Sequence, residues 1–142
     1  MHRKRINNSK NFGEIVTEAL TNGIQTLLLV LGTITMFLVI STIVSNIICL
    51  NSFHQGILNG VIEMTQGLKY ISLLHIPLEL KSVLSVMILS FGGISVHMQM
   101  ISILSDTGIS YRPFFIARII HATISGLLIY FLFDWWIFTI SL

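Results

Sequence analysis

Charge is scarce in this sequence. Only 10% of its 142 residues are charged, whereas 54% are hydrophobic and the mean hydropathy is +0.86. A soluble domain of ordinary composition has roughly 25% charged residues. The composition therefore excludes a typical soluble domain and indicates an integral membrane protein, with the lipid bilayer as its first partner.

Cysteine is nearly absent, and the residue patterns of common enzymes are missing. The single cysteine, Cys49, excludes an internal disulfide and a cysteine metal cluster. The sequence has no His-Glu-x-x-His, no Gly-x-Ser-x-Gly and no phosphate-binding glycine loop with a lysine. His97, Met98 and Met100 alternate around a helix, so core packing explains them better than a metal site does. We expect no catalytic residue, metal, cofactor or nucleic-acid partner.

Long apolar runs are present instead, and they predict three crossings of a membrane. At about 20 residues for each crossing, we expect full transmembrane helices at about residues 24–50, 82–105 and 114–140. Residues 1–23 are basic at their start and then amphipathic, so we expect them on the cytoplasmic side of the membrane. The predicted fold class is all-α integral membrane, with residues 24–142 as the membrane domain.

The segment between the first two crossings differs from an ordinary span. Residues 57–76 contain glycines together with Glu63, Gln66 and Lys69. We expect a re-entrant or broken helical element here rather than a lipid-exposed crossing. With three crossings, Arg112 lies on the cytoplasmic side with the basic N-terminus, as the positive-inside rule favours. Four full spans are the alternative.

A second interruption falls inside the run at residues 82–105. Gly92 and Gly93 occur there, followed by three polar residues, Ser95, His97 and Gln99. Backbone at membrane depth leaves its helix only where protein or water satisfies the freed N–H and C=O groups. A new helix start at this point would present free N–H groups to a polar or anionic group. We therefore expect a break near the two glycines; the alternative is that they only permit a close helix crossing.

The polar residues of the two interruptions form a candidate solute-binding site. It comprises Glu63, Thr65, Gly92, Gly93, Ser95, His97 and Gln99. A carboxylate in hydrocarbon is costly unless it lies near the surface, is paired, or serves a proton, an ion or a polar solute, and these alternatives stay open for Glu63. Hydroxyl, amide and imidazole groups suit a small polar solute better than a hard cation. Proton coupling through Glu63 or His97 is a further hypothesis.

Three charged or titratable residues follow this site in the chain. Asp106, Arg118 and His121 are candidates for a cytoplasmic gate or for a structural role. Arg118 and His121 are three residues apart in an expected helix, so they share a face.

Four stretches of the chain resemble a known family. They are Gly60-Val-Ile-Glu-Met-Thr-Gln-Gly67, Ser90-Phe-Gly-Gly-Ile-Ser-Val-His-Met-Gln99, Ser102-Ile-Leu-Ser-Asp-Thr107 and Tyr111-Arg-Pro-Phe-Phe-Ile-Ala-Arg-Ile-Ile-His121. Over roughly residues 12–130 the chain resembles the C-terminal half of YlbJ-type sporulation integral membrane proteins.

This resemblance implies a nucleoside-recognition or Gate domain, a role in endospore formation, a location in a bacterial cell membrane and half of a transporter-like fold. The related proteins carry two such halves, so it also implies that a second half-domain or a homo-oligomer completes the module. Two functions from different classes stay open. One is a transporter-like half that moves or recognises a small polar solute. The other is a non-transporting membrane scaffold of the sporulation machinery, or a truncated remnant.

Overall fold

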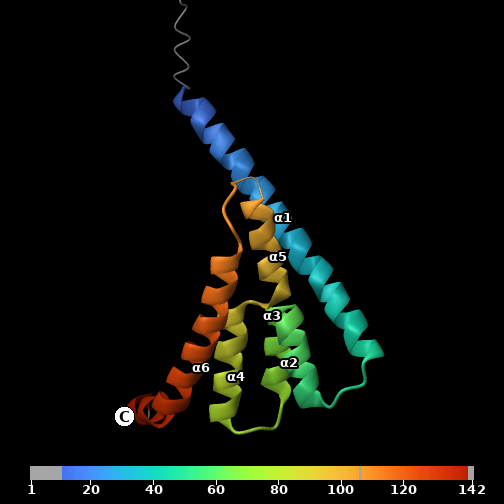
Figure 1. Cartoon of the computed structure of the whole chain (residues 1–142), viewed down its shortest axis with the longest axis vertical. Helices are drawn as coiled ribbons and strands as arrows, with labels where there is room; N and C mark the ends of the chain where they lie inside the picture. The colour runs from blue at the N-terminus through green and yellow to red at the C-terminus, as the bar shows by residue number, and fades with distance from the viewer. Residues whose placement is uncertain (1–10, 106, 141–142) are drawn as a thin grey trace, which may run out of the picture. The chain divides into compact units, whose positions relative to one another are not determined.

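The computed structural model describes residues 11–105 and 107–140, and within them every regular element is an α-helix (Figure 1). The helices are α1 (Phe12–Ile47), α2 (Ser52–Ile62), α3 (Met64–Leu73), α4 (Leu78–Phe91), α5 (Gly93–Leu104) and α6 (Arg112–Ile140). The basic cluster near the N-terminus and Asp106 lie outside the described residues.

Among the described residues, three stretches are long and apolar enough to cross a membrane. They are Phe12–Ile47, Leu78–Leu104 and Arg112–Trp135. The prediction of an all-α integral membrane protein is therefore confirmed. The amphipathic segment expected before residue 24 is helical and continues into the first apolar stretch as one helix, α1. The hydroxyls of Thr21 and Thr26 each donate to the carbonyl four residues earlier in α1. They therefore do not draw the backbone out of the helix.

The chain divides into two units at Gly32 and Thr33, within α1. In the described part of the first unit, large apolar side chains are exposed; Leu27 is 69% exposed and Leu28 is 62% exposed. A helix with such a surface requires lipid or a partner around it. The second unit contains the remainder of α1 and helices α2 to α6, and it holds the packed contacts that position the site.

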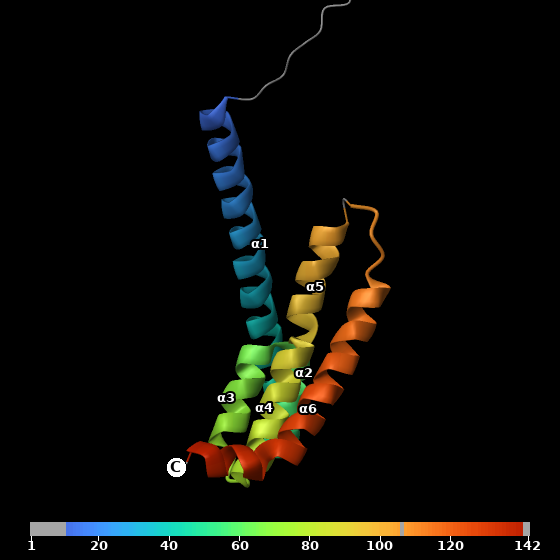
Figure 2. The same ribbon diagram turned by 90° about the vertical axis from the view of Figure 1, so that its left-hand side faces the viewer.

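Helices α2 and α3 form an antiparallel hairpin, so the start of α2 and the end of α3 lie side by side (Figure 1, Figure 2). Asn51 caps α2, since its side chain accepts the N–H of His54 at 3.0 Å. The chain turns at Glu63, where extended backbone ends α2 and begins α3. A β-carbon built on Gly67 would lie 2.1 Å from Cα of Gly60. The hairpin can therefore close this tightly only with glycine at that contact.

Helix α4 ends at a pair of left-handed glycines, and α5 continues beyond them. Gly92 has a φ of +88° and Gly93 a φ of +71°, a backbone region that favours glycine. The helix breaks at the two glycines singled out in the sequence. After the following loop, α6 begins with Pro113 in its first turn, where the missing N–H is tolerated, and packs antiparallel against α4 (Figure 1).

Candidate functional site

The tip of the hairpin meets the break between α4 and α5. A β-carbon built on Gly93 would lie 3.1 Å from the backbone nitrogen of Met64 and 3.2 Å from Cα of Glu63. The glycine thus lets the two interruptions of the helical backbone touch directly. We call this region, residues 62–64 with residues 92–95, the junction.

Glu63 is buried at the junction, with 1% of its surface exposed. Its carboxylate accepts the backbone N–H of Gln66 at 3.0 Å and the hydroxyl of Thr65, which is itself exposed. These bonds place a negative charge at the start of α3, where the helix dipole favours it. Of the alternatives that the sequence left open for Glu63, this geometry favours pairing within the protein.

Helix α5 begins at the junction without a side-chain cap. Ser95, in its first turn, is fully buried, and its hydroxyl has no hydrogen-bond partner among the described residues. Within the same described ranges, the buried Nε2 of Gln99 is also unpartnered. Leaving a buried polar group without a partner costs about 1–3 kcal/mol. A polar group from outside residues 11–105 and 107–140 would therefore stabilise the start of α5 by hydrogen bonding to it.

His97 contacts α6 and the loop before it. Its Nδ1 lies 2.6 Å from the hydroxyl of Tyr111, and its ring packs against Phe91, Phe114 and Phe115. Burial raises the pKa of the Tyr111 phenol, so the hydroxyl is protonated at neutral pH and available to donate to Nδ1. The other ring nitrogen, Nε2, is buried without a partner in the part of the chain described.

Arg118 approaches the break from α6. A β-carbon built on Gly92 would lie 2.8 Å from a guanidinium nitrogen of Arg118, whose Cζ is 5.6 Å from the centre of the Phe114 ring. His121, three residues further along α6, is exposed. Two of the gate candidates, Arg118 and His121, therefore lie one turn apart on α6, and the third, Asp106, lies outside the described ranges.

The predicted solute-binding residues fall into two groups. Those at the junction and next to it in the chain are Glu63, Thr65, Gly92, Gly93 and Ser95. His97 instead belongs to an aromatic cluster with α6, and Gln99 lies one helical turn beyond Ser95. The Tyr111 hydroxyl bond to His97 was not predicted, because these residues are 14 positions apart in sequence.

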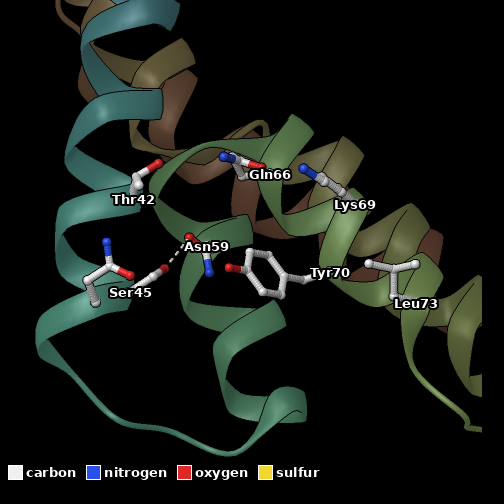
Figure 3. Close-up of a pocket in the computed structure, with 8 residues that line it drawn as sticks. Thr42, Ser45, Asn59, Gln66, Lys69, Tyr70 and Leu73 are labelled. Carbon is white, nitrogen blue, oxygen red and sulfur yellow. Dashed lines mark hydrogen bonds between the residues drawn. The ribbon is translucent and has the colours of Figure 1, made fainter.

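A second polar region, also not predicted, lies between the second half of α1 and the hairpin (Figure 3). Here a cavity of about 400 Å³ is lined by Thr42, Ser45, Asn46, Asn59, Gln66, Lys69, Tyr70 and Leu73. The sequence does carry a signal for it, because the α3 residues in this set are three or four positions apart and share one helix face. Their spacing alone does not reveal that this face meets α1.

Asn59 connects the two walls of this cavity. Its side chain is 1% exposed, and its Oδ1 accepts hydrogen bonds from the hydroxyls of Ser41 and Ser45, the second at 3.0 Å. Its Nδ2 donates to the backbone carbonyl of Gln55 at 2.8 Å. Hydrogen bonds between helices stabilise their association in lipid. Asn59 therefore fixes α2 against the second half of α1.

Comparison with known proteins finds a relative of this chain. No protein-family model and no solved structure matches it. The sporulation integral membrane protein YlbJ of Bacillus subtilis (strain 168) is 32% identical to it over 146 aligned residues. This chain is a homologue of YlbJ. The match covers 91% of the chain but 36% of YlbJ, so the chain spans about a third of the length of this relative.

The homology with YlbJ confirms the resemblance noted in the sequence motifs. Together with the three apolar helices, it identifies the chain as a multi-pass integral membrane protein.

Proposed function

We propose that this chain is a sporulation-associated membrane protein and that it forms half of a transporter-like module for a small polar solute. The name of YlbJ supports the association with sporulation. The observation that carries the solute-binding role is the junction, where the uncapped start of α5 lies beside the buried, unpartnered hydroxyl of Ser95. Broken helices in transporters use such starts to bind polar groups.

In this proposal the solute supplies the hydrogen bond that the Ser95 hydroxyl lacks and lies at the uncapped start of α5. Hydroxyl, amide and imidazole groups fit a nucleoside-like molecule or another small polar metabolite. Glu63 holds the hairpin tip in place by capping α3, so the binding groups are presented by ordered backbone. A second half-domain or a second copy of the chain closes the remaining side, and a proton accompanies the solute through Glu63 or His97.

Uptake by sealed vesicles tests this proposal. Vesicles containing the full chain, alone and with a YlbJ-type second half, are compared with empty vesicles for uptake of labelled nucleosides and other polar metabolites. We expect uptake that falls about tenfold or more in Ser95→Ala, because a binding hydroxyl is lost. The Glu63→Gln variant keeps an oxygen for the α3 cap and removes only the charge, so it reports on proton coupling. His75→Ala, at an exposed histidine outside the junction, is the matched control.

A non-transporting scaffold is the second candidate. One observation favours it, since Glu63, Thr65 and Gln66 bind one another at the hairpin tip and leave that carboxylate no open role. Uptake equal to that of empty vesicles for every solute, with correctly folded protein present, would support the scaffold and contradict transport. Uptake that Ser95→Ala leaves unchanged would remove the junction as the binding site.

A further inference from the structure

We propose that the cavity between α1 and the hairpin binds a small solute that bears a phosphate or carboxylate group. This site is separate from the junction. Its lining comes from the second half of α1 and from the hairpin, whereas the hairpin residue Gly60 faces α4, where a β-carbon on it would lie 2.6 Å from Cδ1 of Ile88. The proposal therefore does not rest on the function proposed for the junction.

The cavity has the size that a binding site requires, and its walls are joined by hydrogen bonds. Its volume of about 400 Å³ falls within the range of small-molecule sites, roughly 300–1,000 Å³. One wall is held to the other by Asn59, whose Oδ1 accepts two hydroxyl bonds from α1. These bonds are made within the protein, so the contact between the walls does not depend on a ligand.

The charge of the lining specifies the ligand. Lys69 is the one charged residue among the lining residues, and its ammonium has no carboxylate or hydrogen-bond partner within the described ranges. The carboxylate nearest to it in sequence, that of Glu63, is already bound by Thr65 and Gln66. A cation on a helix flanked by apolar spans calls for an anionic partner, and phosphate and carboxylate oxygens form the strongest hydrogen bonds with an ammonium.

The remaining polar groups suit the uncharged part of such a solute. Figure 3 shows the Tyr70 hydroxyl pointing from α3 toward Asn59, with Gln66 and Lys69 on the same helix. Gln66 and Asn46 add amide groups that can both donate and accept. The Thr42 hydroxyl is used within α1, since it donates to the carbonyl of Leu38 at 2.9 Å. A ligand with one anionic end and neutral hydroxyls matches this set.

Binding of glycerol 3-phosphate to the full chain in neutral-lipid nanodiscs tests the proposal, with glycerol as the uncharged comparison. We expect saturable binding of the phosphate compound and none of glycerol. Lys69→Met should weaken binding about tenfold or more, because a charge-assisted hydrogen bond is lost, whereas Lys69→Arg should retain it. Lys69 is exposed, so neither variant disturbs the packed contacts. Lys81→Met is the control, since it removes a positive charge outside the cavity, where Nζ donates to the carbonyl of Ser72.

A second arm separates a free solute from a lipid headgroup that carries the same chemistry. Nanodiscs containing phosphatidylglycerol are compared with neutral ones. If phosphatidylglycerol reduces the binding of glycerol 3-phosphate, and the Lys69→Met variant no longer shows this competition, the anion site binds a lipid headgroup. Binding that persists unchanged in Lys69→Met, or no binding of glycerol 3-phosphate, carboxylates or phosphatidylglycerol by the unmodified chain, would overturn the proposal.

Discussion

The buried polar side chains of this protein differ in whether they have hydrogen-bond partners. Asn59 has both ends of its amide engaged, with Ser41, Ser45 and the carbonyl of Gln55. The Ser95 hydroxyl has no partner among the described residues. In lipid, a hydrogen-bonded polar group such as Asn59 holds helices together. A buried polar group without a partner, such as the Ser95 hydroxyl, indicates a functional role.

Replacing Asn59 by leucine should destabilise the fold. The change leaves the two serine hydroxyls of α1 without their acceptor, so we expect a loss of about 1–3 kcal/mol in the free energy of unfolding. Thr42→Val is the matched control, because that exposed hydroxyl bonds only to its own helix. Unfolding by sodium dodecyl sulfate in mixed micelles gives the measurement. Equal stability of the two variants would show that Asn59 does not connect the helices.

Alanine at position 67 should separate the two arms of the hairpin. The new β-carbon would meet backbone atoms of Gly60 at 2.1 and 2.5 Å, which side-chain motion cannot relieve. We expect destabilisation of about 1–3 kcal/mol. Gly32→Ala has open space around its β-carbon and gains helix propensity, so it should be neutral or stabilising by up to about 1 kcal/mol. Unfolding of both variants in the same detergent mixture distinguishes these effects, and similar behaviour would exclude the close contact.

The interruptions of the helices could be located from the sequence to a useful degree. Gly92 and Gly93 stand out in an apolar run, and only glycine accepts their positive φ readily. The role of Glu63 could not be settled in the same way. A carboxylate between glycines suits a helix cap as well as a ligand site, and only the position of the Gln66 N–H distinguishes the two.

Comparing two left-handed glycines isolates the contribution of the junction. Gly93→Ala and Gly108→Ala each place a β-carbon in the left-handed region, at a cost of about 1–2 kcal/mol. Around Gly108 there is open space, whereas Gly93 lies against backbone atoms of residues 62–64. We therefore expect the Gly93 variant to unfold more easily than the Gly108 variant. If thermal unfolding in detergent gave equal losses, the hairpin tip would not press against the break.

At the scale of the whole molecule, the stretches long enough to cross a membrane could be predicted from the apolar runs, whereas the polar cavity could not. Long apolar runs specify spans because about 20 residues cover the hydrocarbon core. The cavity depends on which face of α1 turns toward α3, and that is decided by the short connection from Ile47 to Ser52 together with the Asn59 bonds. The two polar faces can each be recognised in the sequence, but their contact is tertiary.

The hairpin leads to a prediction about membrane topology. We expect the hairpin to add no crossing, because its chain ends lie together, and we expect α1 and Leu78–Leu104 each to cross the membrane once, which returns the chain to its starting side. In a Cys49→Ser background, Asn11→Cys and Ile109→Cys should both react with a membrane-impermeant maleimide only after the cells are permeabilised. Native Cys49, exposed at the other end of α1, should react in intact cells.

Asn11→Cys and Ile109→Cys labelling from opposite sides would contradict this topology and indicate four full crossings. Labelling of both from outside, with Cys49 protected, would keep three crossings and reverse the orientation that the positive-inside rule favours.

The contact between Gly67 and Gly60 limits how this chain can evolve. A side chain at position 67 would collide with backbone, and no exchange of a neighbouring side chain can make room for it. A β-carbon at position 60 would instead meet the side chain of Ile88, which a smaller residue at position 88 would relieve. Residues 60 and 88 can therefore change together, each compensating for the other. At position 67, any residue other than glycine would disrupt the hairpin.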